Sequence, residues 1–162
     1  MFAPNSHYLD DMKRLIPSKV NNYLLLKLPA AYLCGVRLRS IDQHRAEVGV
    51  RFRWINQNPF KSMFWAVQGM AAELAGGMLV MQSLRAQDAS ISMLLVGTQG
   101  EFTKKARGKI LFTCQDGAIV ESGVAQCLKT GAGVQFELTT EGRDEDGDLV
   151  CRFRFHWSVK VR

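Results

Sequence analysis

Residues 62–84 read SMFWAVQGMAAELAGGMLVMQSL, and this stretch decides the fold. Glu73 is the only charged residue within it. Its length and its density of apolar residues predict one long helix that is apolar on every side, with Ser62 as its N-cap. Such a helix either crosses a membrane or lies inside a globular fold. A carboxylate at bilayer depth is costly and no second stretch of this kind follows, so we expect a core helix.

The segments that follow and precede this helix alternate apolar and polar residues, a period typical of strands. Residues 36–54 predict a β-hairpin with one wet face. Further strands are expected at residues 91–102, 109–114, 134–140 and 149–161. A weaker helical pattern at 118–129 ends at Gly131, a residue type that favours helix ends. Before the hairpin, residues 8–28 have near-helical spacing that Pro17 interrupts, which predicts two short helices, the second ended by Pro29.

This order of elements predicts an α+β fold. A sheet of about six antiparallel strands needs an apolar layer on one face, and the single long helix can supply it. We therefore expect a curved antiparallel sheet wrapped around a central apolar helix. The chain has no internal repeat and no linker, so we expect a single domain over residues 1–162, with an N-terminal helical segment at 1–33 and the core at 34–162.

Composition narrows the class of partner. The chain has 162 residues, of which 47% are hydrophobic and 22% charged, so disorder is not expected. The net charge of +6 favours an anionic partner: nucleic acid, a membrane surface or a phosphorylated small molecule. The basic residues are scattered over the strands and no nucleic-acid motif is present, so we expect a small molecule and neither nucleic acid nor membrane.

Cysteines and histidines give no sign of a metal site. The four cysteines lie far apart, and no histidine has a Cys or Asp partner at metal or triad spacing. The first eleven residues carry acids and no apolar run typical of a secretory signal. We expect reduced cysteines and a cytoplasmic location.

Two short motifs carry a family resemblance. They are NPFKSM at residues 58–63 and AAEL at residues 71–74. From about Leu28 to Arg162 the chain resembles the hot-dog fold, in which a sheet wraps a central helix, and specifically its acyl-CoA thioesterase-like members. Within them it is most similar to an uncharacterised branch, a domain of unknown function that carries both motifs.

The thioesterase pattern is matched only in part. Members commonly carry an Asn, then His-Gly-Gly six residues later, then an Asp or Glu nine residues after the His. Asn58 and Glu73 stand at the first and last of these positions. Phe64, Trp65 and Ala66 replace His-Gly-Gly, so the imidazole is lost and the Trp side chain adds bulk, which implies a reshaped or a closed pocket.

The resemblance implies hydrolysis of an acyl-CoA thioester, with coenzyme A as part of the substrate and no other cofactor. Its catalytic set is Glu73, Asn58, Trp65 and Phe64. Glu73 would activate water or attack the carbonyl, and the Trp65 and Phe64 amides near the helix N-terminus would stabilise the oxyanion. Burial should raise the pKa of Glu73. The alternative is a structural Glu73 satisfied by the backbone or by Ser hydroxyls.

Weaker candidates for substrate binding lie outside this set. Lys104, Lys105 and Arg107 form the densest basic cluster and could hold the phosphates of coenzyme A, or they could be a solvated turn. Ser92 lies near the place where some relatives have a hydroxyl that positions water. Gln68 is a substrate-binding candidate on the helix, with packing as its alternative.

The spacing along the helix has a consequence for assembly. Residues 64 or 65 and residue 73 are about 12 to 14 Å apart at 1.5 Å per residue, too far for one thioester carbon. If both serve one site, two copies of the chain must supply them, which implies a homodimer or a dimer of dimers. The rival function is non-catalytic binding of an acyl-CoA or fatty-acyl group. A dehydratase ranks third because no His lies near the helix in sequence, and nucleic-acid binding ranks fourth.

Overall fold

The computed structural model of the chain describes residues 14–162. The helices are α2 (Pro17–Lys27), α3 (Pro29–Leu33), the 3-10 turn η1 (Trp54–Asn56), α4 (Trp65–Ala86) and α5 (Gly117–Thr130). The strands are β1 (Arg37–Ile41), β2 (Ala46–Arg51), β3 (Ile91–Phe102), β4 (Lys109–Cys114), β5 (Val134–Arg143) and β6 (Leu149–Val161). The predicted order of helices and strands is therefore confirmed over the described residues.

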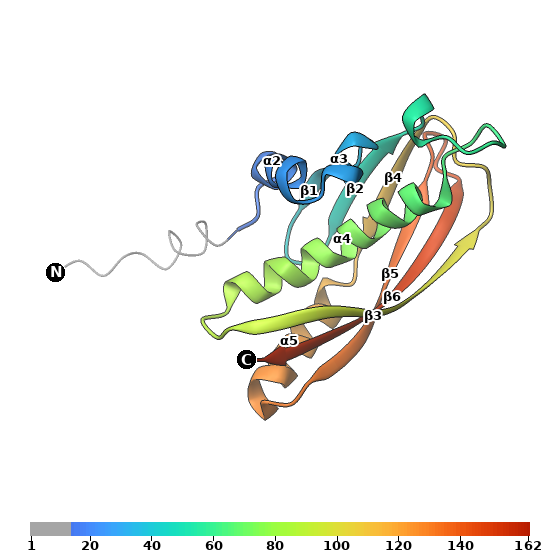
Figure 1. Ribbon diagram of the computed structural model, residues 1–162. Coiled ribbons are helices and arrows are strands. Elements are labelled where there is room, and N and C mark those ends of the chain that lie inside the picture. Colours follow the sequence, from blue (N-terminus) through green and yellow to red (C-terminus); the bar gives the residue numbers. More distant parts are fainter. Residues whose placement is uncertain (1–13) are drawn as a thin grey trace.

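In this part of the chain the strands form one six-stranded antiparallel sheet in the order β1-β2-β4-β5-β6-β3 (Figure 1). The longest pairing joins β3 to β6, from Ile91 opposite Val161 to Phe102 opposite Cys151. Its register shifts between Leu95 and Gly97, which marks a β-bulge. Because β3 pairs only with β6, it is one edge of the sheet, and β1 is the other edge.

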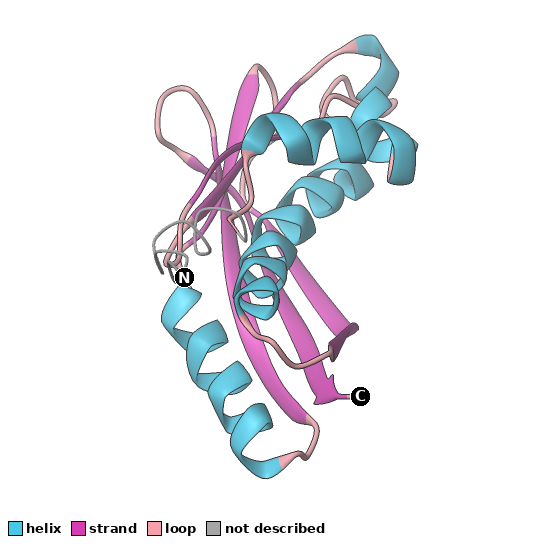
Figure 2. Cartoon of the chain, turned by 90° about the vertical axis from the view of Figure 1, so that its left-hand side faces the viewer, coloured by secondary structure: helices cyan, strands magenta, loops and turns pink. Residues whose placement is uncertain are grey.

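Helix α4 packs lengthwise on one face of the sheet, with α2 and α3 on the side of β1 and β2 (Figures 1 and 2). Its sheet-facing side is built largely from small residues, and Ala71, Ala72 and Ala75 are fully buried. Thr140 on β5 ties the two layers together, because its buried hydroxyl donates to the Ala72 carbonyl oxygen at 3.1 Å. The central apolar helix on an antiparallel sheet is thus confirmed.

The helix is not enclosed on every side, which corrects the sequence-based expectation. Trp65 is exposed, and Met70 and Glu73 are only partly buried. The sheet covers one side of α4 and the N-terminal helices cover a second, so a strip of the helix surface stays open. The one carboxylate of the helix, Glu73, is partly buried beside α3.

Several predicted boundaries need correction. The N-cap of α4 is Phe64, because the buried Ser62 is bonded to Asn58 instead. Pro17 and Pro29 each begin a helix, as proline commonly does at the first helical position. The hairpin ends at Arg51, before the predicted Trp54. Most of the helix expected before Pro17 lies outside the described residues.

Candidate active site

The loop before α4 is held in one shape by Asn58. The Oδ1 atom of Asn58 accepts hydrogen bonds from the Phe60 N–H at 2.9 Å and the Ser62 N–H at 3.2 Å. Its Nδ2 donates to Ser62 Oγ at 3.1 Å and to the Met63 carbonyl oxygen at 3.4 Å. Both polar ends of the Asn58 side chain are therefore used inside the loop, so its role here is to position the start of α4.

A groove of about 370 Å³ opens beside this loop at the N-terminus of α4, and we call it the α4 groove. It is lined by Asn58, Ser62, Met63, Trp65, Gln68, Phe102, Thr103, Lys104, Lys105 and Ala106. The second half of this lining follows β3 and lies far from the helix in sequence. No sequence pattern pointed to Phe102, Thr103 or Ala106.

The two backbone N–H groups expected to hold an oxyanion, those of Phe64 and Trp65, are not equally free to donate. The Phe64 N–H donates to the Asn56 carbonyl oxygen at 2.8 Å, so it is already used. Trp65 is the first residue of α4, and the first turn of a helix leaves its N–H groups without acceptors inside the helix. The positive end of the helix dipole lies at the same place, which favours an anionic oxygen there.

Gln68 lines the same groove and is buried, with 4% of its surface exposed. Its Nε2 donates to the Met63 carbonyl oxygen at 3.1 Å. Its Oε1 is also buried and has no hydrogen-bond partner among the described residues. The residues that line the groove therefore include one backbone donor without an acceptor inside the helix, the Trp65 N–H, and one unpaired side-chain acceptor, Gln68 Oε1.

Glu73 lies in a second hollow, which we call the Glu73 pocket. Its volume is about 220 Å³, and Lys27, Leu28, Pro29, Ala30, Ala31, Met70 and Leu74 line it with Glu73. No hydrogen bond or ion pair to Glu73 is found within residues 14–162, so the alternative of a carboxylate satisfied by backbone or Ser groups gains no support. Burial raises the pKa of Glu73 above its ordinary value of 4.5.

The α4 groove and the Glu73 pocket share no lining residue. Trp65 and Glu73 are eight positions apart, which is about 12 Å along a straight helix. The structure therefore places the candidate base and the candidate oxyanion donors of one chain in separate hollows of one helix. One thioester carbon cannot touch both within a single chain.

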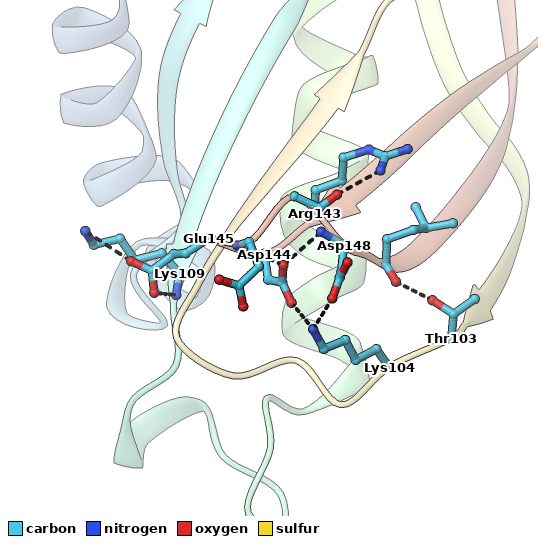
Figure 3. Close-up of polar contacts among 10 residues, drawn as sticks. Thr103, Lys104, Lys109, Arg143, Asp144, Glu145 and Asp148 are labelled. Carbon is cyan, nitrogen blue, oxygen red and sulfur yellow. Dashed lines mark hydrogen bonds and ion pairs between the residues drawn. The ribbon is translucent and has the colours of Figure 1, made fainter.

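The basic cluster does not act as a unit. Lys104 Nζ lies 2.6 Å from carboxylate oxygens of both Asp144 and Asp148, in the acidic turn after β5 (Figure 3). Arg107 donates from Nε to the Lys61 carbonyl oxygen at 3.2 Å and lies outside the α4 groove. Lys105 is exposed and lines the groove. Of the three predicted phosphate ligands, Lys105 alone both lines the groove and has no carboxylate partner among the described residues.

The remaining candidates lie apart from both hollows. Ser92, on β3, donates from Oγ to the Lys160 carbonyl oxygen at 3.0 Å and lines neither the groove nor the pocket. Burial raises the pKa of Cys114 to about 11 and that of Cys151 to about 12, so neither offers a thiolate near neutral pH.

Solved structures of similar shape identify the fold. A probable thioesterase from Pseudomonas aeruginosa is similar with a TM-score of 0.77 and 18% identity, over 93% of this chain and 99% of that one. A thioesterase from Haemophilus influenzae is similar with a TM-score of 0.70 and 15% identity, over 91% of this chain and 92% of that one. A protein of unknown function from Chlorobaculum tepidum gives 0.75 and 14%, over 91% and 98%. The fold is the hot-dog fold of thioesterase-like proteins.

The family is also defined at the level of sequence. Residues 19–159 match the family described as a domain of unknown function, DUF4442, and the chain belongs to that family. A comparison with curated proteins gave no match. Among the described residues, no helix is long and apolar enough to span a membrane.

Proposed function

We propose that this protein is an acyl-CoA thioesterase in which Glu73 activates water. The observation that carries the proposal is the carboxylate itself. It is the only charge in the stretch 62–84, it is partly buried without a partner in the described chain, and its pKa is raised. A base of this kind at the centre of a thioesterase-like fold suits attack of water on a thioester.

In the proposed reaction, ionised Glu73 takes a proton from water, and the water oxygen bonds to the thioester carbonyl carbon. The carbonyl oxygen becomes an oxyanion that accepts a hydrogen bond from the Trp65 N–H, at the positive end of α4. The carbon–sulfur bond then breaks, and the thiolate of coenzyme A takes up the proton held by Glu73. The products are a carboxylic acid and free coenzyme A.

We further propose that two protomers build each site, because Trp65 and Glu73 of one chain lie in separate hollows. The edge strand β3 supports a homodimer. Leu94 and Val96 on this strand have 64% and 47% of their surface exposed, and an apolar, unpaired edge favours addition of another strand. The α4 groove of one protomer would then receive Glu73 of the partner subunit. Two such dimers could associate further.

The decisive experiment is hydrolysis of a panel of acyl-CoA thioesters by the wild-type protein and by Glu73→Gln. We expect the substitution to lower kcat by about 100-fold or more, as loss of a general base does. Glu121→Gln is the matched control, because Glu121 is exposed on α5 and lines neither the α4 groove nor the Glu73 pocket. Equal rates for the wild type and Glu73→Gln would remove Glu73 from the mechanism.

A non-catalytic acyl-CoA or fatty-acyl binding protein is the second candidate. The observation in its favour is Trp65, whose side chain lines the α4 groove at a position where thioesterases of this fold commonly carry Gly. Binding of an acyl-CoA without turnover by the wild-type protein would select this function. Turnover that depends on Glu73 would select the thioesterase.

A further inference from the structure

Gln68 holds a buried hydrogen-bond acceptor that nothing in the described chain satisfies. The bond from Nε2 to the Met63 carbonyl oxygen fixes which end of the side chain is the nitrogen, because a carbonyl can only accept. Oε1 is therefore the free end, and it is buried at a residue that lines the α4 groove. Buried polar atoms in folded proteins are nearly always paired. A buried acceptor left unpaired among the described residues, beside a groove, is suited to a donor on a bound ligand.

Apart from the exposed Lys105, the other polar side chains of the groove are committed elsewhere. Asn58 and Ser62 bond each other and the loop backbone. Thr103 donates from Oγ1 to the Leu149 carbonyl oxygen at 2.6 Å, and Lys104 is held by the acidic turn. Pairing Gln68 Oε1 with the Thr103 hydroxyl would break the bond of Thr103 to Leu149, and the Lys104 ammonium already lies between two carboxylates.

We infer that Gln68 determines substrate specificity, because its Oε1 accepts a hydrogen bond from a donor on the bound thioester. The inference rests on the proposed function. Gln68 follows Trp65 by three positions, so the two residues are neighbours on the helix surface and both line the groove. A thioester whose oxyanion meets the Trp65 N–H would bring atoms near its carbonyl to Gln68.

Two donors on a thioester have the required chemistry. One is the amide N–H of the cysteamine arm, which is two methylenes from the sulfur. The other is a hydroxyl on the acyl chain near the carbonyl. A site that hydrogen-bonds a ligand rejects the analogue that lacks the bonding group, because the buried protein atom is then left unpaired. An acceptor at residue 68 thus discriminates against thioesters without such a donor.

The test compares two pairs of substrates that differ by one donor. The first pair is hexanoyl-pantetheine and the same compound methylated on the cysteamine amide nitrogen. The second pair is 3-hydroxyhexanoyl-CoA and hexanoyl-CoA. We expect the wild type to prefer the donor-bearing member of one pair by about tenfold or more in kcat/KM, and the pair that responds identifies the donor. Gln68→Met, similar in size but without the acceptor, should lose that preference.

Control variants separate specificity from packing. Gln87→Met removes a Gln at the other end of α4 that also donates to a backbone carbonyl, and it should keep the wild-type preference. Gln68→Glu at mildly acidic pH restores an acceptor, since its protonated form can donate to Met63 and still accept through its carbonyl oxygen. It should recover the preference. Thermal melts establish that each variant is folded.

A binding measurement keeps the inference separate from catalysis. The thioethers hexyl-CoA and 3-hydroxyhexyl-CoA, together with hexyl-pantetheine and its N-methyl derivative, cannot be hydrolysed, and their Kd values are measured by calorimetry. If no thioester is turned over, the proposed function fails, while a donor-dependent Kd lost in Gln68→Met still supports the role of Gln68. Equal preference in the wild type and Gln68→Met, no preference in either pair, or no binding of any thioether would overturn it.

Discussion

Glu73 Oε1 lies 3.1 Å from the point where a Cβ atom on Gly77 would stand, one helical turn further along α4. Two ring carbons of Trp157 lie 3.4 Å from the same point. Because Gly77 has no side chain, the Glu73 carboxylate can lie against the helix at this point. At the neighbouring Gly76 the nearest atom, from Leu138, is 3.6 Å away, which is an ordinary contact.

These two glycines give a matched pair of substitutions. Gly77→Ala should displace the Glu73 carboxylate and lower kcat for thioester hydrolysis, whereas Gly76→Ala should leave kcat unchanged. Both should gain about 1 kcal/mol of helix propensity, which the crowding at residue 77 offsets in part. Steady-state kinetics and thermal melts of both variants check this. Full activity in Gly77→Ala would show that the present position of the carboxylate is not needed.

The raised pKa of Glu73 predicts opposite pH trends for activity and stability. A group whose pKa is raised by folding binds its proton more tightly in the folded protein, so its stabilising contribution is present below the unfolded value and is lost as pH rises through the folded value. General-base catalysis needs the ionised form, so kcat/KM should rise with pH across the same interval, with a midpoint above 4.5.

Glu73→Gln should remove this titration from both profiles, because an amide does not ionise. The free energy of unfolding from urea titrations, and kcat/KM where activity is measurable, are followed from acidic to neutral pH in both proteins. Profiles that coincide for the wild type and the variant would assign the pH dependence to another group.

Much of the fold could be predicted from local patterns, because a long apolar helix among alternating strands allows few arrangements. The residue at which that helix starts could not be predicted in this way. Serine is a common N-cap residue, but Ser62 is instead hydrogen-bonded to Asn58. These bonds form only in the folded loop. Likewise, a proline shows that a helix is interrupted but does not say on which side the helix lies. Pro17 and Pro29 both begin helices.

The candidate site was only partly predictable. Glu73 stands out as a lone charge in an apolar helix, and its helical spacing from Trp65 already places the two apart. Phe102 and Thr103 form one wall of the α4 groove because the end of β3 lies beside the start of the helix. No local sequence pattern predicts this packing. The pairing of Lys104 with Asp144 also joins residues far apart in sequence.

The two neighbouring lysines should differ in their effect on coenzyme A binding. Lys105→Met should raise KM for acyl-CoA thioesters severalfold, because its ammonium lines the α4 groove and can meet a phosphate. Lys104→Met should change KM little, since Asp144 and Asp148 already hold that ammonium. Acyl-pantetheine thioesters, which lack the nucleotide phosphates, serve as control substrates. An equal rise in KM for both substrate classes in Lys105→Met would argue against a phosphate contact.

A charged side chain on the β3 edge should break the proposed dimer. Leu94→Lys places a cation on an exposed, apolar position of the edge strand, and lysine at such edges blocks strand addition. Sedimentation should show a dimer for the wild type and a monomer for the variant. Leu111→Lys is the control, because Leu111 is exposed to 39% but lies on β4, which has neighbours on both sides. A dimer in Leu94→Lys would place the interface elsewhere.

Two inactive variants should restore activity when they are combined in one dimer. Trp65→Pro removes the proposed oxyanion donor, and proline is well tolerated at the first position of a helix. Trp65→Ala, which keeps the N–H, controls for loss of the side chain. If Trp65 and Glu73 come from different protomers, a Trp65→Pro/Glu73→Gln heterodimer has one intact site and one doubly altered site. Random assortment in co-expressed protein should then give about a quarter of wild-type activity.

If each protomer held a complete site, every site in the mixed dimer would carry one defect, and co-expression would restore nothing. The same preparation thus distinguishes a shared site from two independent ones. Separation of the heterodimer by two affinity tags, followed by assay of that fraction alone, should give about half of the wild-type rate per dimer.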